Sequence, residues 1–270
     1  MDLQLRDRVY LVTGGGRGLG FAAAEALLAE GARVVVSSPR EASAAAAAAR
    51  LADDAGVADG VAWLAADNAD VATPERLIAT AEDRFGRLDG ALISVGGTPP
   101  GTVATTSDDA WRGSFESVFL GAIRLARVLA AHLTGRGNGP GTGARAGTGG
   151  SVVFVLASSV RVPLAELAVS NGLFPGLAGV VKMLSDDLGP SGIRMNGILP
   201  VRIATERVRQ LDALSGDPDE VRARKSEDIP LRRYGEPEEF GRVAAFLLSP
   251  AASYITGAMI PVDGGSIRSI

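Results

Sequence analysis

Short runs of consecutive apolar residues alternate along this chain with longer segments in which apolar residues recur at helical spacing. Uninterrupted apolar runs are typical of strands buried on both faces, and helical spacing is typical of helices that cover a sheet. The pattern predicts strands at residues 8–13, 33–37, 61–66, 88–95, 151–157, 193–199 and 258–262. It predicts helices at residues 19–30, 41–56, 74–85, 108–133, 168–188 and 237–248. Because this alternation forms right-handed βαβ units, we expect an α/β fold: a doubly wound parallel sheet of about seven strands with helices on both faces.

The alternation continues through all 270 residues without a shift in composition, and we therefore expect a single domain. One segment breaks the pattern, because residues 134–150 contain eight glycines and few apolar side chains. A glycine-rich chain has little to bury and much conformational freedom to lose. We therefore interpret this segment as a flexible insertion between a helix and a strand.

Composition and charge exclude several classes of function. Lysine and arginine number 27 against 31 aspartates and glutamates, a net charge of −4, which leaves no positive field to attract nucleic acid. The chain has no cysteine for a disulfide, a thiolate zinc site or a nucleophile. Its one histidine, His132, ends a helical segment, so we assign it a structural role and expect no metal site. We expect a cytoplasmic protein without a membrane partner, because the sequence shows neither a signal-peptide pattern nor an apolar stretch of membrane-spanning length.

The first predicted strand leads into a glycine-rich turn with the sequence TGGGRGLG, which opens the first predicted helix. Gly14, Gly18 and Gly20 allow the backbone to turn tightly and to approach a ligand closely. The amino terminus of the helix then offers N–H groups and a positive dipole end to a pyrophosphate. Glycines in such a turn also have a purely steric use, but their position between a first strand and a first helix favours dinucleotide binding.

At this point the chain resembles the short-chain dehydrogenase/reductase family, whose glycine pattern TGxxxGxG matches the turn. The segments ADN (66–68), IRMNGILP (193–200) and YITGAMIPVDGG (254–265) resemble the family's adenine-contacting turn, sixth strand and carboxyl-terminal signature. The resemblance covers nearly the whole chain. It implies a Rossmann-type fold, a nicotinamide dinucleotide cofactor, a small-molecule substrate, and a homotetramer or homodimer.

The resemblance also implies where cofactor and substrate bind. Helical periodicity over residues 205–226 resembles a mobile substrate lid of this family. The cofactor-binding residues implied by the matched motifs are Gly14, Gly16, Arg17, Gly18, Leu19, Gly20, Ser38, Arg40, Asp67, Asn68, Gly96, Pro200 and Thr205.

Three residues near the end of the second predicted strand favour NADP(H) over NAD(H). A carboxylate at this place would bind the ribose of NAD and repel a 2′-phosphate, but the chain has Ser37 and Ser38 there. Arg40 follows two residues later, and Arg17 lies in the glycine turn. Guanidinium groups match the geometry of phosphate, so we expect both arginines to bind the 2′-phosphate, the alternative being that they are solvated surface charges.

The residues that carry the family's acid-base chemistry are missing. Counting back from IRMN places the family's tyrosine at Ser170 and its lysine at Phe174, and the relay asparagine falls at Val118. Only the family's serine has a match, at Ser158 or Ser159. A serine hydroxyl at position 170 is a poor acid at neutral pH. We therefore expect an atypical site in which Ser158, Ser159 or Ser170 takes part, and in which the changes Ser170→Tyr and Phe174→Lys together raise the turnover of simple ketones.

Three functions remain open from the sequence. The first is a divergent NADP(H)-dependent oxidoreductase that acts on an unknown carbonyl, hydroxyl or enone compound. The second is a non-redox enzyme that uses the same pocket. The third is a nucleotide-binding subunit without catalysis. The preserved glycine and adenine turns favour retained nucleotide binding, and by analogy within the fold they favour the oxidoreductase.

Overall fold

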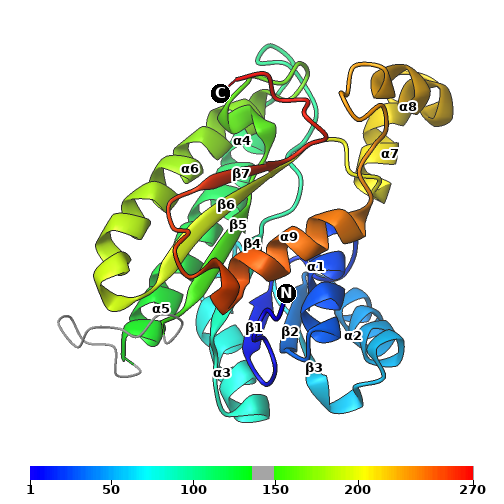
Figure 1. Cartoon of the computed structure of the whole chain (residues 1–270). Helices are drawn as coiled ribbons and strands as arrows, with labels where there is room; N and C mark the ends of the chain where they lie inside the picture. Colours follow the sequence, from blue (N-terminus) through cyan, green and yellow to red (C-terminus); the bar gives the residue numbers. More distant parts are fainter. Residues whose placement is uncertain (136–148, 270) are drawn as a thin grey trace.

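A computed structural model describes residues 1–135 and 149–269, and most of the predicted flexible insertion at 134–150 lies outside these residues. Seven strands form one parallel sheet in the order β3-β2-β1-β4-β5-β6-β7 (Figure 1). The predicted doubly wound α/β fold is confirmed. The strands are β1 (Val9–Val12), β2 (Arg33–Ser38), β3 (Val61–Ala65), β4 (Gly90–Ser94), β5 (Ser151–Val155), β6 (Arg194–Pro200) and β7 (Met259–Val262).

Helices connect the strands and cover both faces of the sheet (Figure 1). The α-helices are α1 (Gly18–Ala29), α2 (Glu41–Ala55), α3 (Thr73–Phe85), α4 (Asp108–Ser114), α5 (Gly121–Gly135), α6 (Ala168–Leu188), α7 (Glu206–Ala213), α8 (Pro218–Ser226) and α9 (Pro237–Leu248). Short helical turns are η1 (Ala58–Gly60), the π-helical η2 (Phe115–Leu120), η3 (Ser158–Val160), η4 (Gly189–Ser191) and η5 (Pro250–Ala252). The predicted helix bounds agree with these within a few residues, apart from the lid.

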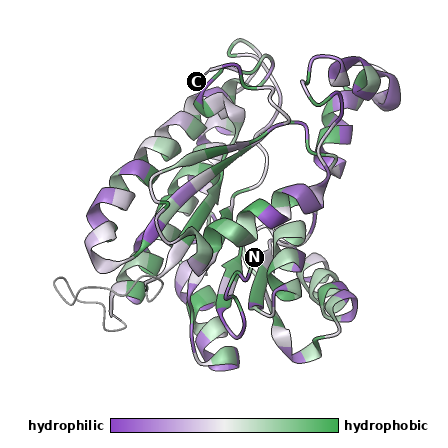
Figure 2. Cartoon of the chain, viewed as in Figure 1, coloured by the Kyte–Doolittle hydropathy of each residue, from purple (hydrophilic) through white to green (hydrophobic). Residues whose placement is uncertain are grey.

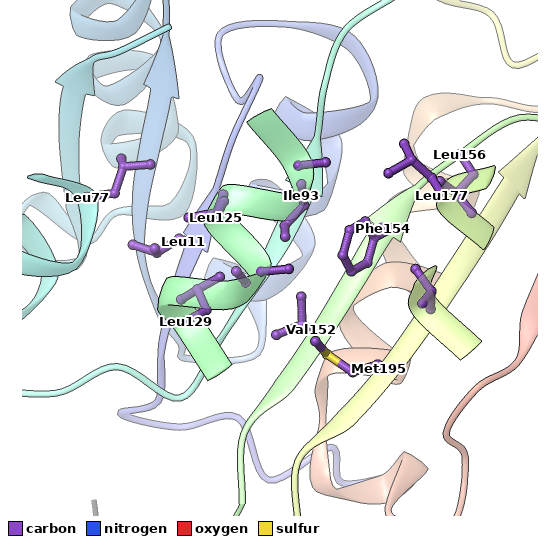
Figure 3. Close-up of a cluster of buried hydrophobic side chains, with 14 of the residues drawn as sticks. Leu11, Leu77, Ile93, Leu125, Leu129, Val152, Phe154, Leu156, Leu177 and Met195 are labelled. Atoms are coloured by element: carbon purple, nitrogen blue, oxygen red, sulfur yellow. The ribbon is translucent and has the colours of Figure 1, made fainter. Parts of the chain in front are cut away.

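Alternate side chains of each strand enter two separate cores. In β5, Val152 and Phe154 pack with α3, α5 and α6, whereas Val153 and Val155 pack with α1, α2 and α9. Figure 3 shows the first core, in which Leu125 and Leu129 of α5 lie near Leu11 of β1. Apolar colour follows the strands and the inner sides of these helices in Figure 2. Burial on both faces explains why the strands are continuous apolar runs.

Helices α4 and α5 join through η2 into one run of 28 residues, which is long and apolar enough by length and composition to cross a membrane. This corrects the expectation that no stretch reaches that length. The apolar character has a structural cause, because Leu125, Ala126 and Leu129 are fully buried against the sheet. Burial in the core therefore accounts for the composition of this helix.

The segment predicted as one lid is two short helices, α7 and α8, which we call the α7–α8 arm (206–226). It projects beyond the carboxyl ends of the strands (Figure 1). Asp212, only 2% exposed, accepts hydrogen bonds from Arg202 (2.9 Å), Lys225 (2.9 Å) and Tyr234 (3.0 Å). Burial raises the pKa of Tyr234 to about 12, so its hydroxyl keeps the proton that it donates. This network attaches the arm to the loop after β6.

Candidate functional site

The candidate site lies at the carboxyl edge of the sheet, where β1 and β4 are neighbours and the strand order reverses. Thr13, fully buried, ties these two strand ends together: its hydroxyl donates to the carbonyl of Ser94 (2.9 Å) and accepts the N–H of Ser94 (2.9 Å). Ligands of open α/β sheets bind in the crevice at such a switch point. The glycine turn follows Thr13 directly, so it forms one wall of that crevice.

The glycines of the turn are required by close approach and by backbone conformation. A Cβ atom on Gly20 would lie 2.5 Å from the carbonyl oxygen of Gly14. Gly14 and Gly18 have φ angles of +62° and +58°, in the left-handed region that favours glycine. Arg17 occupies the N-cap position of α1, and its side chain makes no capping hydrogen bond to the first N–H groups of the helix. The first N–H groups of α1 are therefore available to an anion, as pyrophosphate binding requires.

A groove with a cavity volume of about 480 Å³ runs along this edge. It is bounded by the glycine turn, the ends of β2, β4, β5 and β6, and the start of α7. Eleven of the thirteen predicted cofactor residues line it: Gly14, Gly16, Arg17, Gly18, Leu19, Gly20, Ser38, Arg40, Gly96, Pro200 and Thr205. Asp67 and Asn68 do not, and their side chains bond to the backbone of Ala69 (2.9 Å) and Ser94 (3.5 Å) instead.

Arg17 and Arg40 are exposed and both line this groove. Within residues 1–135 and 149–269, neither arginine forms an ion pair with a carboxylate. Ser38, the last residue of β2, also lines the groove, with its Oγ 3.1 Å from the place of a Cβ on Gly16. This end of the groove is therefore positively charged and carries no acid.

A second cavity of about 680 Å³ adjoins the groove and shares Pro200, Arg202 and Val208 with it. Its wall is mostly apolar, and it comes from the loops after β4 and β5 and from the α7–α8 arm. Ser158, at the end of β5, lines this cavity. Its Oγ makes no hydrogen bond to any residue that the structure describes. Ser158 can therefore donate to an oxygen of a ligand.

Ser159 and Ser170 have a different environment from Ser158. Both are buried, their hydroxyl oxygens are 3.0 Å apart, and Ser159 also bonds to the carbonyl of Ser170 (3.2 Å). Phe174 (5% exposed) and Val118 (3%) belong to the first core and line neither cavity. The positions counted as the family's tyrosine, lysine and asparagine thus form a closed, largely apolar region beside the cavity.

The structure adds residues that the sequence analysis missed or did not assign. Arg207 lines the groove and donates to the carbonyl of Thr98 (2.6 Å). Arg202 lines both cavities with a left-handed φ of +51°, a conformation that is strained for a residue with a side chain. The only available signal for either was a charged side chain within a few residues after the end of β6. His132 lines neither cavity and lies 3.4 Å from Glu82 on α3.

Comparisons with known proteins agree with this geometry. Residues 14–266 match the family model described as enoyl-(acyl carrier protein) reductase. The chain is 34% identical over 271 residues to levodione reductase of Leifsonia aquatica, covering 96% of this chain and 94% of that protein. It is 31% identical over 268 residues to meso-2,3-butanediol dehydrogenase of Serratia marcescens, covering 99% and 97%.

A solved structure of L-sorbose reductase from Gluconobacter frateurii, complexed with NADPH and L-sorbose, superposes with a TM-score of 0.89. Its sequence is 26% identical, and the alignment covers 100% of both chains. These matches extend over almost the full length of the chain. They agree with the fold and with the glycine turn at the switch point. The chain belongs to the short-chain dehydrogenase/reductase family of oxidoreductases.

Proposed function

We propose that this protein is an NADP(H)-dependent oxidoreductase for a small carbonyl or hydroxyl compound, and that it works without the family's tyrosine and lysine. One observation carries the proposal: a groove suited to a dinucleotide opens, at Pro200, Arg202 and Val208, onto an apolar cavity that contains a free serine hydroxyl. Ligands bound in the two spaces would meet at these residues.

The residues of the groove fit a phosphorylated dinucleotide. The close contact at Gly20 excludes a side chain there, so the backbone of the turn is accessible to the pyrophosphate. The uncapped amino terminus of α1 offers it free N–H groups. Arg17 and Arg40 lack carboxylate partners among the described residues, and Ser38 presents no acid to a 2′-phosphate. L-sorbose reductase, a solved relative, is described as complexed with NADPH, which supports the same choice.

When bound in the groove, NADPH would supply the hydride that reduces the carbonyl carbon of a substrate in the cavity. The carbonyl oxygen must gain one proton for the product alcohol to form. Ser158 can orient that oxygen, because it lines the cavity and its hydroxyl has no hydrogen-bond partner among the described residues. A serine hydroxyl is a weak acid at neutral pH, so we assign the proton itself to water. The mostly apolar wall favours a substrate with a hydrocarbon body.

A binding titration and a turnover assay test this function. Nucleotide fluorescence should show tighter binding of NADPH than of NADH. The double variant Arg17→Ala with Arg40→Ala should lower the ratio of the NADH to the NADPH dissociation constant by roughly 10- to 100-fold. Ser38→Asp should weaken NADPH binding selectively, because its carboxylate repels the 2′-phosphate. Equal affinity of the natural protein for both nucleotides would refute the preference.

Turnover is measured as the loss of nicotinamide absorbance with a panel of small ketones, diketones and enones. Ser158→Ala should lower the rate by about 10²-fold without changing NADPH affinity, as expected for one lost hydrogen bond to the reacting oxygen. Ser215→Ala is the matched control, since Ser215 lines the same cavity. NADPH binding without turnover of any compound would instead favour a nucleotide-binding subunit. Cytoplasmic location and assembly into a homotetramer or homodimer stay predictions from the sequence.

A further inference from the structure

The start of the α7–α8 arm lies directly over the nucleotide groove. The side chain of Thr205, the N-cap residue of α7, is 3.6 Å from the place of a Cβ on Gly18 in the glycine turn. Two residues later, Arg207 extends across the groove, and its Nη2 donates to the carbonyl of Thr98 (2.6 Å), in the loop after β4. The arginine side chain therefore links the arm to the opposite wall of the groove.

Arg207 is a cation without a counter-charge. No carboxylate of residues 1–135 and 149–269 lies within ion-pair distance of it, and Glu206, which also lines the groove, is bonded to Gln210 (3.2 Å). Partial burial, and then the nearby guanidinium of Arg17, lower the pKa of Arg207. Two cations that face one groove, one of them partly desolvated, are unfavourable unless an anion binds between them.

The neighbouring arginine of the same helix shows the ordinary alternative. Arg209 is exposed and pairs with Asp219 at 3.0 Å, so its charge is compensated on the surface of the arm. Arg207 instead gives its hydrogen bond to an uncharged carbonyl at the wall of the groove. An anion in the groove is a stronger acceptor than that carbonyl, because hydrogen bonds with an ionised partner are the stronger ones.

The place of Arg207 in the groove decides which phosphate of the nucleotide it can reach. Ser38 ends β2 and Arg40 lies two residues beyond it, at the strand end where the ribose of the adenosine half binds in folds of this kind. Arg207 contacts Gly97 and Thr98, after β4 and on the other side of the glycine turn. The phosphates between these two places are those of the pyrophosphate, so the 2′-phosphate is left to Arg17 and Arg40.

We propose that Arg207 is a cofactor-binding residue supplied by the α7–α8 arm. When the nucleotide binds, the Arg207 guanidinium gives up its hydrogen bond to the Thr98 carbonyl and binds the pyrophosphate instead. This contact then fixes the arm over the substrate cavity. The inference rests on the proposed nucleotide binding. The same arm supplies Leu211, Leu214 and Lys225 to the cavity wall. The segment that this contact would hold in place therefore forms part of the cavity wall.

The experiment compares NADPH and NADH binding in the full chain by nucleotide fluorescence. Arg207→Ala should raise both dissociation constants by about tenfold, the loss expected for one charge-assisted contact. Arg209→Ala, the matched control on the same helix, should change neither by more than about twofold, because its exposed ion pair contributes little. Arg207→Gln keeps a donor for the Thr98 carbonyl and removes the charge. It should bind as weakly as the alanine variant, and thermal unfolding verifies that both variants are folded.

Trypsin cleavage provides a second measurement, because the arm contains several arginines and a lysine. Saturating NADPH should slow cleavage within residues 206–226 of the natural protein and of Arg209→Ala, but not of Arg207→Ala. Unchanged affinity in Arg207→Ala and Arg207→Gln would overturn the inference and leave the proposed function intact. A loss confined to NADPH would also overturn it, since Arg207 would then bind the 2′-phosphate. Failure of the natural protein to bind either nucleotide would overturn the proposed function as well.

Discussion

The change Phe174→Lys tests whether the region beside the cavity can still accept the family's lysine. Phe174 is 5% exposed, packs in the core between the sheet and α6, and lines neither the groove nor the cavity. A lysine at this place would hold its ammonium group among apolar side chains. A buried ammonium is disfavoured, so the pKa of the new lysine should fall well below the roughly 10.4 of an exposed one.

The size of the effect follows from that pKa. If the lysine is neutral in the folded protein at pH 7, the pKa difference costs about 4–5 kcal/mol of stability, at about 1.4 kcal/mol for each unit. For a chain of this length, this corresponds to a fall in melting temperature of roughly 10–20 °C. Because the folded pKa is lowered, the variant should gain stability as pH rises toward 10. At pH 9 the charge should cost under about 2 kcal/mol.

Urea unfolding followed by circular dichroism at pH 7 and pH 9 measures both effects. Phe174→Met is the control, because it alters the packing without adding a charge and should show no extra dependence on pH. The natural protein is measured at both pH values as well. Its change in unfolding free energy with pH is subtracted from that of each variant. A lysine variant within about 1 kcal/mol of the methionine variant at pH 7 would refute the reasoning, since its ammonium group would then reach water or the groove.

The same argument reverses an expectation drawn from sequence alone. Residue counting predicts that Ser170→Tyr with Phe174→Lys raises the turnover of simple ketones. Ser170 is 3% exposed and its hydroxyl is 3.0 Å from that of Ser159, so a tyrosine ring has no space there without repacking. We therefore expect the double variant to be less stable than the natural protein and no faster.

Three further variants test other parts of the structure. Gly20→Ala would place a methyl group 2.5 Å from a carbonyl oxygen of the glycine turn, and should cost about 1–3 kcal/mol in urea unfolding and weaken NADPH binding at least about tenfold. The control Gly179→Ala, with nothing within 4 Å of its Cβ, should do neither, and equal effects of the two would contradict the steric argument. Asp212→Asn removes the buried charge that holds two cations and should cost about 3–5 kcal/mol in the same assay; a loss under about 1 kcal/mol would show that this network does not hold the arm. Hydrogen bonds from Arg233 and then from a backbone N–H lower the pKa of Glu239 from 4.5 to about 2, so its stabilisation is complete above pH 4.5 and is lost toward pH 2. The difference in thermal stability between the natural protein and Glu239→Gln should therefore shrink below pH 4.5, and a constant difference at lower pH would contradict the assignment.

The sheet and most helices could be predicted because local sequence and tertiary environment agree. Strand β5 is buried on both faces, so four of its five residues, from Val152 to Val155, form an uninterrupted apolar run. Gly20 is fixed by a contact within its own turn, only six residues away from Gly14. The lid differs because Asp217 caps α8 by accepting the N–H groups of Asp219 and Glu220 (3.0 and 3.1 Å), which starts a second helix.

The parts of the site that could not be predicted depend on contacts between residues distant in sequence. Arg207 meets Thr98 across 109 residues, and nothing in the sequence distinguishes it from Arg209, whose partner lies on the neighbouring helix of the arm. Ser158 and Ser159 were equivalent as candidates. Only the packing of α6, which brings Ser170 to Ser159, leaves Ser158 as the hydroxyl open to the cavity.

The cations that line the cavity come from the loop after β6 and from the α7–α8 arm. Phe174 and Val118 make the inner side of α6 and η2 apolar, so no charge comes from that side. Arg202 and Lys225 enter the cavity from the loop after β6 and from the α7–α8 arm, and Asp212 holds both. Lys225 and part of the cavity wall belong to the arm, and Asp212 of the arm also holds Arg202, so a movement of the arm changes the charges and the wall together.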